Sequence, residues 1–186
     1  MAIKNSSRQF SIAIALCMLV CVSATLPNLG FCADAELPDP SAEQSTTVLT
    51  KIQEITDRAS SLVSKAVDFL GTRYKRGGNT VAQGLDCSGL VRIVFKDALN
   101  IDLPRTAAEI SRTGEKIEPG ELQPGDLVFF NTLKRGFSHV GIYMGDNKFI
   151  HSPSKGGQVR IESMELAYWK KRFNGARRIN DDGPQN

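Results

Sequence analysis

Cysteine and histidine are scarce in this chain of 186 residues, which contains four cysteines and two histidines. Three of the cysteines lie within the first 32 residues, so Cys87 stands alone in the rest of the sequence. That usage excludes a disulfide framework for the body of the chain, and no C-x-x-C or H-x-x-x-H pair offers the usual spacing of a structural zinc site. The lone cysteine therefore calls for a chemical explanation.

Acidic residues are absent before Asp34, whereas Lys4 and Arg8 precede an apolar run of 13 residues, Phe10–Val22. This is the composition of a secretory signal peptide, and the run is too short to span a membrane comfortably. We therefore expect residues 1–35 to direct export to the periplasm or cell envelope, and no membrane span in the mature form.

Two cleavage sites compete, because small residues precede both Ala24 and Ala35 at the required positions. Cleavage after Ala35 leaves Cys87 as the only thiol, whereas cleavage after Ala24 leaves a disulfide between Cys32 and Cys87 open. Phe31 stands where lipoprotein processing before Cys32 needs a small residue. We therefore expect a soluble exported protein without a lipid anchor.

Charge of one sign does not dominate either. The net charge of +3 falls to +2, with 21 basic and 19 acidic residues, when residues 1–35 are removed. No basic stripe indicates nucleic-acid binding. The basic residues near the C-terminus are interpreted as a solvated face, with an anionic polymer contact as the alternative: Lys170, Lys171, Arg172, Arg177 and Arg178.

The remaining sequence suits one domain. Residues 36–50, rich in Pro, Ser, Thr and acidic residues, are predicted to be a linker, residues 51–180 the domain, and residues 181–186 a tail. Apolar periodicity predicts a helix from Ile52 to Leu70 and another from Cys87, and Thr106 with Glu109 has the spacing of a capping box.

Five strands are predicted after these helices, at residues 125–130, 139–144, 148–151, 159–161 and 176–179. Helices followed by strands indicate an α+β fold, with helices packed on an antiparallel sheet of about five strands.

Cys87 falls at the predicted start of a buried helix, directly after a helix-capping residue, Asp86. Unpaired N–H groups and the positive end of the helix dipole favour a thiolate there, so we expect a lowered pKa and a nucleophilic sulfur. The alternative is a small buried side chain, because free cysteine is among the most buried residue types.

Both histidines fall in one predicted hairpin. A three-residue loop, Gly145–Asn147, would set His151 opposite Gly141 and place His139 and His151 on one face, whereas a two-residue loop would separate them. The first register presents a base and an orienting group to a thiol. The alternative for the same side chains is a Cys-His-His zinc site, but no fourth ligand is evident, and we expect neither a metal nor another cofactor.

Six short motifs follow one another in a recognisable order: Tyr74 with Gly77-Gly78, Asp86-Cys87-Ser88-Gly89, Leu103-Pro104-Arg105-Thr106, Gly125–Phe130, Ser138–Tyr143 and Phe149-Ile150-His151. Between residues 57 and 179 the chain thereby resembles the NlpC family of papain-like cysteine peptidases of the bacterial cell wall, as a small stand-alone member. The resemblance implies a papain-like NlpC fold, with Cys87 as nucleophile, His139 as general base and His151 as the residue that orients it.

The resemblance also implies that Tyr74 assists near the oxyanion, although a core aromatic with a satisfied hydroxyl is an equal alternative. Asp86 either only caps the helix or also contacts a substrate amine. Arg105 is either a surface residue or a fork for a substrate carboxylate. The backbone N–H groups of Ser88 and Cys87 are candidate oxyanion donors.

The implied substrate is the stem peptide of peptidoglycan, and the expected bond is the one between γ-D-glutamate and diaminopimelate. D,D-endopeptidase action on cross-links and N-acetylmuramoyl-L-alanine amidase action are the alternatives within the class. From another class, the domain could be a catalytically silent wall-binding module. We expect a monomer.

Overall fold

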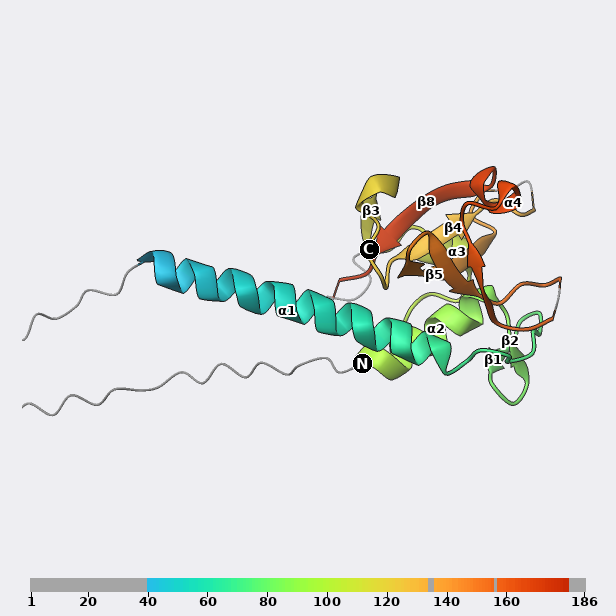
Figure 1. Ribbon diagram of the computed structural model, residues 1–186. Helices are drawn as coiled ribbons and strands as arrows, with labels where there is room; N and C mark the ends of the chain where they lie inside the picture. Colours follow the sequence, from blue (N-terminus) through green and yellow to red (C-terminus); the bar gives the residue numbers. More distant parts are fainter. Residues whose placement is uncertain (1–39, 134–135, 156, 181–186) are drawn as a thin grey trace, which may run out of the picture. The chain divides into compact units, whose positions relative to one another are not determined.

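The computed structural model describes residues 40–133, 136–155 and 157–180 (Figure 1). The predicted signal peptide, its cleavage sites and the 181–186 tail lie outside the described residues. The described part combines helices with an antiparallel sheet, so the α+β prediction is confirmed.

The elements follow one another in this order: α1 (Pro40–Val67), β1 (Asn79–Thr80), β2 (Gly84–Leu85), α2 (Cys87–Leu99), α3 (Ala107–Ile110), β3 (Glu115–Ile117), a 3-10 turn (Pro119–Glu121), β4 (Leu127–Phe130), β5 (His139–Gly145), β6 (Lys148–His151), β7 (Arg160–Ser163), α4 (Ala167–Lys170) and β8 (Phe173–Arg178).

The main sheet has six strands among the described residues, in the order β3-β8-β4-β5-β6-β7, and β1 with β2 forms a separate two-stranded sheet. The prediction of about five strands missed β3, which pairs with β8. The three residues of β3 include one buried side chain, Ile117, so no alternating apolar pattern marks the strand.

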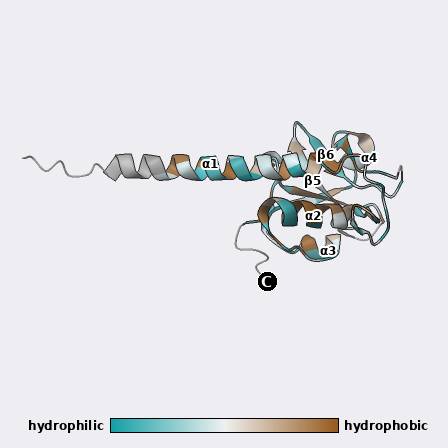
Figure 2. Ribbon diagram, turned by 90° about the horizontal axis from the view of Figure 1, so that it is seen from below, coloured by the Kyte–Doolittle hydropathy of each residue, from teal (hydrophilic) through white to brown (hydrophobic). Residues whose placement is uncertain are grey.

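Helix α1 begins at Pro40, so the prediction of a linker without structure up to residue 50 is wrong. Proline is tolerated in the first turn, where its missing N–H would have no helical partner. The helix ends at Val67, three residues before the predicted end. Its last two turns pack into the core through Leu62 and Ala66, whereas Ile52 and Ile55 remain more than half exposed. Figure 2 shows α1 extending beyond the sheet and the other helices.

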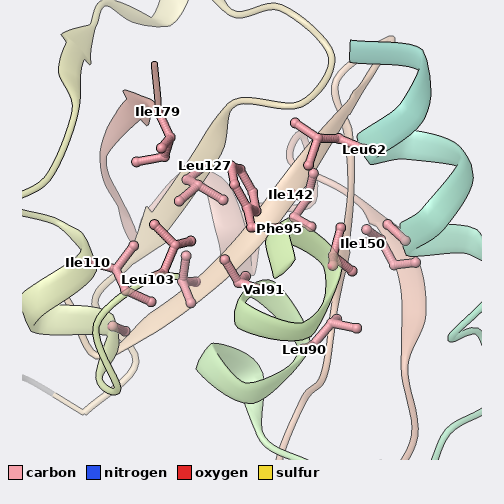
Figure 3. Packing of buried hydrophobic residues seen from close by; sticks show 14 of the residues in the cluster. Leu62, Leu90, Val91, Phe95, Leu103, Ile110, Leu127, Ile142, Ile150 and Ile179 are labelled. Carbon is pink, nitrogen blue, oxygen red and sulfur yellow. The ribbon is translucent and has the colours of Figure 1, made fainter. Parts of the chain in front are cut away.

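The sheet buries apolar side chains on both faces, which is why β4 reads as the unbroken run Leu127–Phe130. Leu127 and Phe129 belong to the cluster that includes α2, where Val91 and Phe95 point toward the sheet (Figure 3). Val128 and Phe130 belong to a second cluster on the other face, around Trp169. These alternating side chains fix the register of β4.

The β5–β6 hairpin reaches its predicted register by a different route. Its turn has two residues, Asp146 and Asn147, with φ of 49° and 54°, so the predicted three-residue loop is wrong. A bulge between Tyr143 and Gly145 restores the missing residue. Ile142 pairs with Ile150, so that Gly141 comes opposite His151 as predicted.

Candidate active site

Cys87 is the first residue of α2, and its neighbours hold the start of this helix in place. Asp86 is the N-cap, with extended backbone angles, and its Oδ1 accepts a hydrogen bond of 2.7 Å from the Gly89 N–H. Gly89 also packs against the preceding loop, since a Cβ there would lie 2.2 Å from the Gly78 carbonyl oxygen. The cap predicted from the sequence is therefore confirmed, and the half-buried Cys87 sits where the helix opens.

Two contacts join this helix start to the hairpin. The backbone N–H of Val140, the residue after His139, is close enough to the Cys87 sulfur to favour its thiolate form. The Ser152 hydroxyl, directly after His151, donates to the Leu85 carbonyl at 2.7 Å. The structure thereby brings the thiol to the strand ends that carry the two histidines.

The thiol is electrostatically different from the sequence-based expectation. The backbone N–H groups of Val140, Ser88 and Cys87 itself favour the thiolate, as expected at a helix start. Burial and the negative charge of Asp86 have the opposite, larger effect, and the net result is a pKa of Cys87 raised to about 11. The expected lowering of this pKa is therefore wrong for the substrate-free site, which holds a neutral thiol.

The two imidazoles lie on one face of the sheet and bind each other. His139 Nε2 is 2.8 Å from His151 Nδ1, and the rings meet nearly at right angles. The indole of Trp169 stacks on His139 at 5.5 Å between ring centroids and meets His151 edge-on. Burial lowers the pKa of both histidines to about 3, so both are neutral near pH 7.

Further polar residues beyond the predicted site contact His151. Glu162 Oε2 lies 3.1 Å from His151 Nε2, and the same oxygen accepts the indole N–H of Trp169 at 2.6 Å. The guanidinium of Arg160 binds the other carboxylate oxygen at 2.8 Å. Glu162 is not among the predicted site residues because the predicted strand ends at Ile161, whereas β7 continues to Ser163 and places residues 160 and 162 on one face.

Asp86, Ser88 and Arg105 form a closed network beside the nucleophile. Arg105 binds both carboxylate oxygens of Asp86, at 2.7 and 3.2 Å, and the hydroxyl of Ser88 at 2.8 Å. The carboxylate also accepts the Gly77 N–H. Although burial opposes the charge, the hydrogen bonds from Arg105 and Gly89 lower the pKa of Asp86. The fork predicted to hold a substrate carboxylate is thus bound to Asp86 in this structure.

Tyr74 lies within the electrostatic reach of the thiol. Its backbone forms a bridge with Leu85, two residues before Cys87. Burial, and then the Coulombic interactions with Cys87 and Asp86, raise the pKa of its hydroxyl. The structure therefore places Tyr74 near the predicted site, and its assistance to the oxyanion stays a prediction.

The zinc alternative does not match the observed contacts. His139 Nε2 and His151 Nδ1 face each other at hydrogen-bond distance, so these two nitrogens do not converge on a common third point. Among the described residues, no group of three or more His, Cys, Asp or Glu side chains has the arrangement of a metal site. Within the described ranges, none of the helices has the length and apolar composition of a membrane span.

A thiol at a helix start beside a buried histidine pair on an antiparallel sheet defines an α+β protein with a Cys-His-His site. The model of the NlpC/P60 family matches residues 71–178, which include all seven of the predicted site residues. The chain belongs to the NlpC/P60 family.

Two relatives and one solved structure illustrate the similarity. The gamma-DL-glutamyl hydrolase of Bacillus subtilis is 44% identical over 121 residues, which are 64% of this chain and 29% of the relative. The murein DD-endopeptidase MepS/murein LD-carboxypeptidase of Escherichia coli K12 is 41% identical over 123 residues, 66% of this chain and 64% of the relative. The chain thus spans less than two thirds of either relative.

The crystal structure of an NlpC/P60 family protein from Bacillus cereus superimposes with a TM-score of 0.60 at 34% identity, covering 64% of this chain and 39% of that one. The predicted fold family is therefore confirmed by an independent comparison.

Proposed function

We propose that this chain is a cysteine-type peptidase that hydrolyses stem peptides of peptidoglycan in the cell envelope after export. The observation that carries the proposal is the convergence of a helix-start thiol with a buried, mutually bonded histidine pair. Such a constellation supplies a nucleophile, a base and a group that orients the base. The names of the two relatives, a glutamyl hydrolase and a murein endopeptidase, support the substrate class.

The raised pKa of Cys87 and the lowered pKa of His139 define the starting state as a neutral thiol beside a neutral imidazole. Proton transfer to His139 therefore accompanies the attack of the sulfur on the scissile carbonyl, rather than preceding it. Backbone N–H groups of Cys87 and Ser88 stabilise the oxyanion. His139 then returns the proton to the leaving amine, and water hydrolyses the acyl-enzyme on Cys87.

The proposed bond is the one between γ-D-glutamate and diaminopimelate, and the name of the Bacillus subtilis relative supports it. A second candidate is the D,D-cross-link, because the Escherichia coli relative is named a DD-endopeptidase. A pocket of about 410 Å³ is formed by residues that precede Cys87 in the sequence: Arg73, Lys75, Arg76, Gly77, Gly78 and Gln83. Its basic side chains suit a substrate rich in carboxylates.

Digestion of purified muropeptides, with products identified by mass spectrometry, tests the proposal. Release of a fragment ending in γ-D-glutamate supports the first bond, and conversion of cross-linked dimers to monomers supports the second. Cys87→Ala is the matched control, since it removes the sulfur and little volume. Turnover by Cys87→Ala equal to that of the parent chain, or wall binding by a parent chain that releases no product, contradicts the proposal.

A further inference from the structure

A hydrogen-bonded series continues past the His139–His151 pair and ends on a carboxylate. Glu162 Oε2 lies 3.1 Å from His151 Nε2, on the side of the ring opposite to His139. The His151 side chain is fully buried, and the Glu162 side chain is 20% exposed. Trp169 and Arg160 each donate to one oxygen of this carboxylate, so they hold both of its oxygens in place.

These contacts determine where the protons lie. An ionised carboxylate only accepts hydrogen bonds, so His151 Nε2 must carry the proton that lies between it and Glu162. A neutral imidazole has one proton, which leaves His151 Nδ1 as an acceptor. His139 Nε2 must then donate across the 2.8 Å contact, and His139 Nδ1 is left with a free lone pair.

We infer that Glu162 is a positioning residue that sets the tautomers of both histidines, and thereby makes Nδ1 of His139 the atom that takes the Cys87 proton. The inference rests on the proposed function for its catalytic consequence, whereas the tautomers themselves are independent of any activity. Glu162 acts through His151 and touches neither the thiol nor the substrate.

The charge of Glu162 contributes in the same direction. It favours the protonated form of His139, and so raises the pKa of that imidazole against the burial that lowers it. When His139 accepts the thiol proton, the imidazolium is stabilised through His151 by a fixed negative charge. Arg160 moderates this effect, because its positive charge lowers the pKa of His151.

The alternative is a purely structural role, in which Glu162 only forms an ion pair with Arg160 and accepts the indole N–H of Trp169. Both roles predict some loss of stability when Glu162 is replaced, so stability cannot separate them. Only the positioning role predicts a change in which ring nitrogens of His139 and His151 carry protons.

Nitrogen-15 NMR of the full chain, labelled at histidine and free of any histidine tag, reads those protons directly because the chain has two histidines. Near pH 7 we expect both rings to be protonated at Nε2 and unprotonated at Nδ1. In Glu162→Leu the acceptor is lost, and we expect His151 to populate the Nδ1–H tautomer. Glu165→Gln is the matched control, since it removes a negative charge from an exposed neighbour.

Turnover of muropeptides is the second measurement. Glu162→Leu should lower kcat by about 10- to 100-fold with little change in KM, the scale on which supporting residues act. Glu162→Gln should retain more activity, because its amide oxygen can still accept from His151, and it remains informative if the leucine variant does not fold. Glu165→Gln should match the parent.

Three results would overturn the inference: a proton on Nδ1 of His151 in the parent chain, unchanged tautomers in folded Glu162→Leu, or parental kcat in Glu162→Leu. A parent chain that hydrolyses no muropeptide yet shows the expected tautomers would contradict the proposed function and leave the positioning by Glu162 intact.

Discussion

Two polar networks flank the thiol, and they differ in charge: one contains an ionised carboxylate paired with a guanidinium, and the other contains two neutral imidazoles. The cap network, Asp86, Ser88 and Arg105, keeps a full carboxylate charge beside Cys87 by pairing it with a guanidinium. The histidine network, His139, His151 and Glu162, buries two imidazoles that stay neutral. Asp86 and Ser88 adjoin Cys87 in the sequence, and Arg105 follows α2. The three residues of the histidine network come from three different strands, β5, β6 and β7. The comparison separates residues that hold the nucleophile from residues that activate it.

The largest expected effect comes from removing the base. His139→Ala should abolish muropeptide hydrolysis, since no other side chain in the histidine network is placed to take the Cys87 proton. Mass-spectrometric assay of the digest measures this loss. Thermal unfolding is the control, and a folded His139→Ala protein that still turns over at the parental rate would assign the proton transfer elsewhere.

A smaller effect is expected one residue further along the series. His151→Asn keeps a side chain that can accept from His139, whereas His151→Leu does not, so the asparagine variant should be faster. We expect a gap of at least about 10- to 100-fold in kcat between the two variants. Equal rates would mean that His151 does not orient His139, despite the same-face register of the hairpin.

The cap network should respond in stability. Asp86→Ala removes the helix cap and leaves Arg105 without its partner, and caps contribute about 0.5–2 kcal/mol to the free energy of unfolding. Chemical denaturation of the parent, of Asp86→Ala and of Asp86→Asn measures the loss. A stability unchanged by both substitutions, with KM strongly raised, would instead support the predicted contact of Asp86 with a substrate amine.

Acid should weaken the fold through the histidine network. Both histidines have a lowered folded-state pKa, so their contribution is present above the unfolded value of about 6.5 and is lost as the pH falls toward 3. Each proton taken up on unfolding changes the free energy by at most about 1.4 kcal/mol per pH unit. Thermal midpoints between pH 7 and 4 should fall less steeply in His139→Gln/His151→Gln than in the parent; parallel curves would contradict the neutral pair.

Removal of metal ions is expected to have no effect on activity. Exhaustive dialysis against a chelator should leave muropeptide hydrolysis unchanged, because Cys87 acts as a nucleophile and the two imidazoles bind each other. Elemental analysis of the purified protein accompanies the assay. Stoichiometric zinc together with activity that disappears on its removal would revive the Cys-His-His metal site.

Short-range patterns predicted much of the architecture. The capping box of Thr106 and Glu109 is present, and strand β6 has its predicted bounds, because both depend on side chains a few residues apart. Strand β3 and the N-terminal half of α1 were missed. The first has too few buried residues to show a period, and the second follows a composition that also suits a linker.

The candidate site divides in the same way. The sequence by itself determined which residues could do chemistry, since a lone cysteine after a capping aspartate and two histidines in one hairpin leave few alternatives. The predicted register of the hairpin was right, but a bulge near Met144 compensated for a turn one residue shorter than expected. A bulge of this kind leaves no reliable local signature.

Only the tertiary structure decided the electrostatics of the site. The sequence indicated a helix start that lowers the pKa of Cys87, whereas burial against the hairpin raises it. The tertiary structure also placed Glu162 and Trp169 beside His151, through the pairing of β6 with β7 and the position of helix α4. Desolvation and cross-strand contacts depend on which segments surround a group, so they are set by the assembled fold rather than by neighbours along the chain.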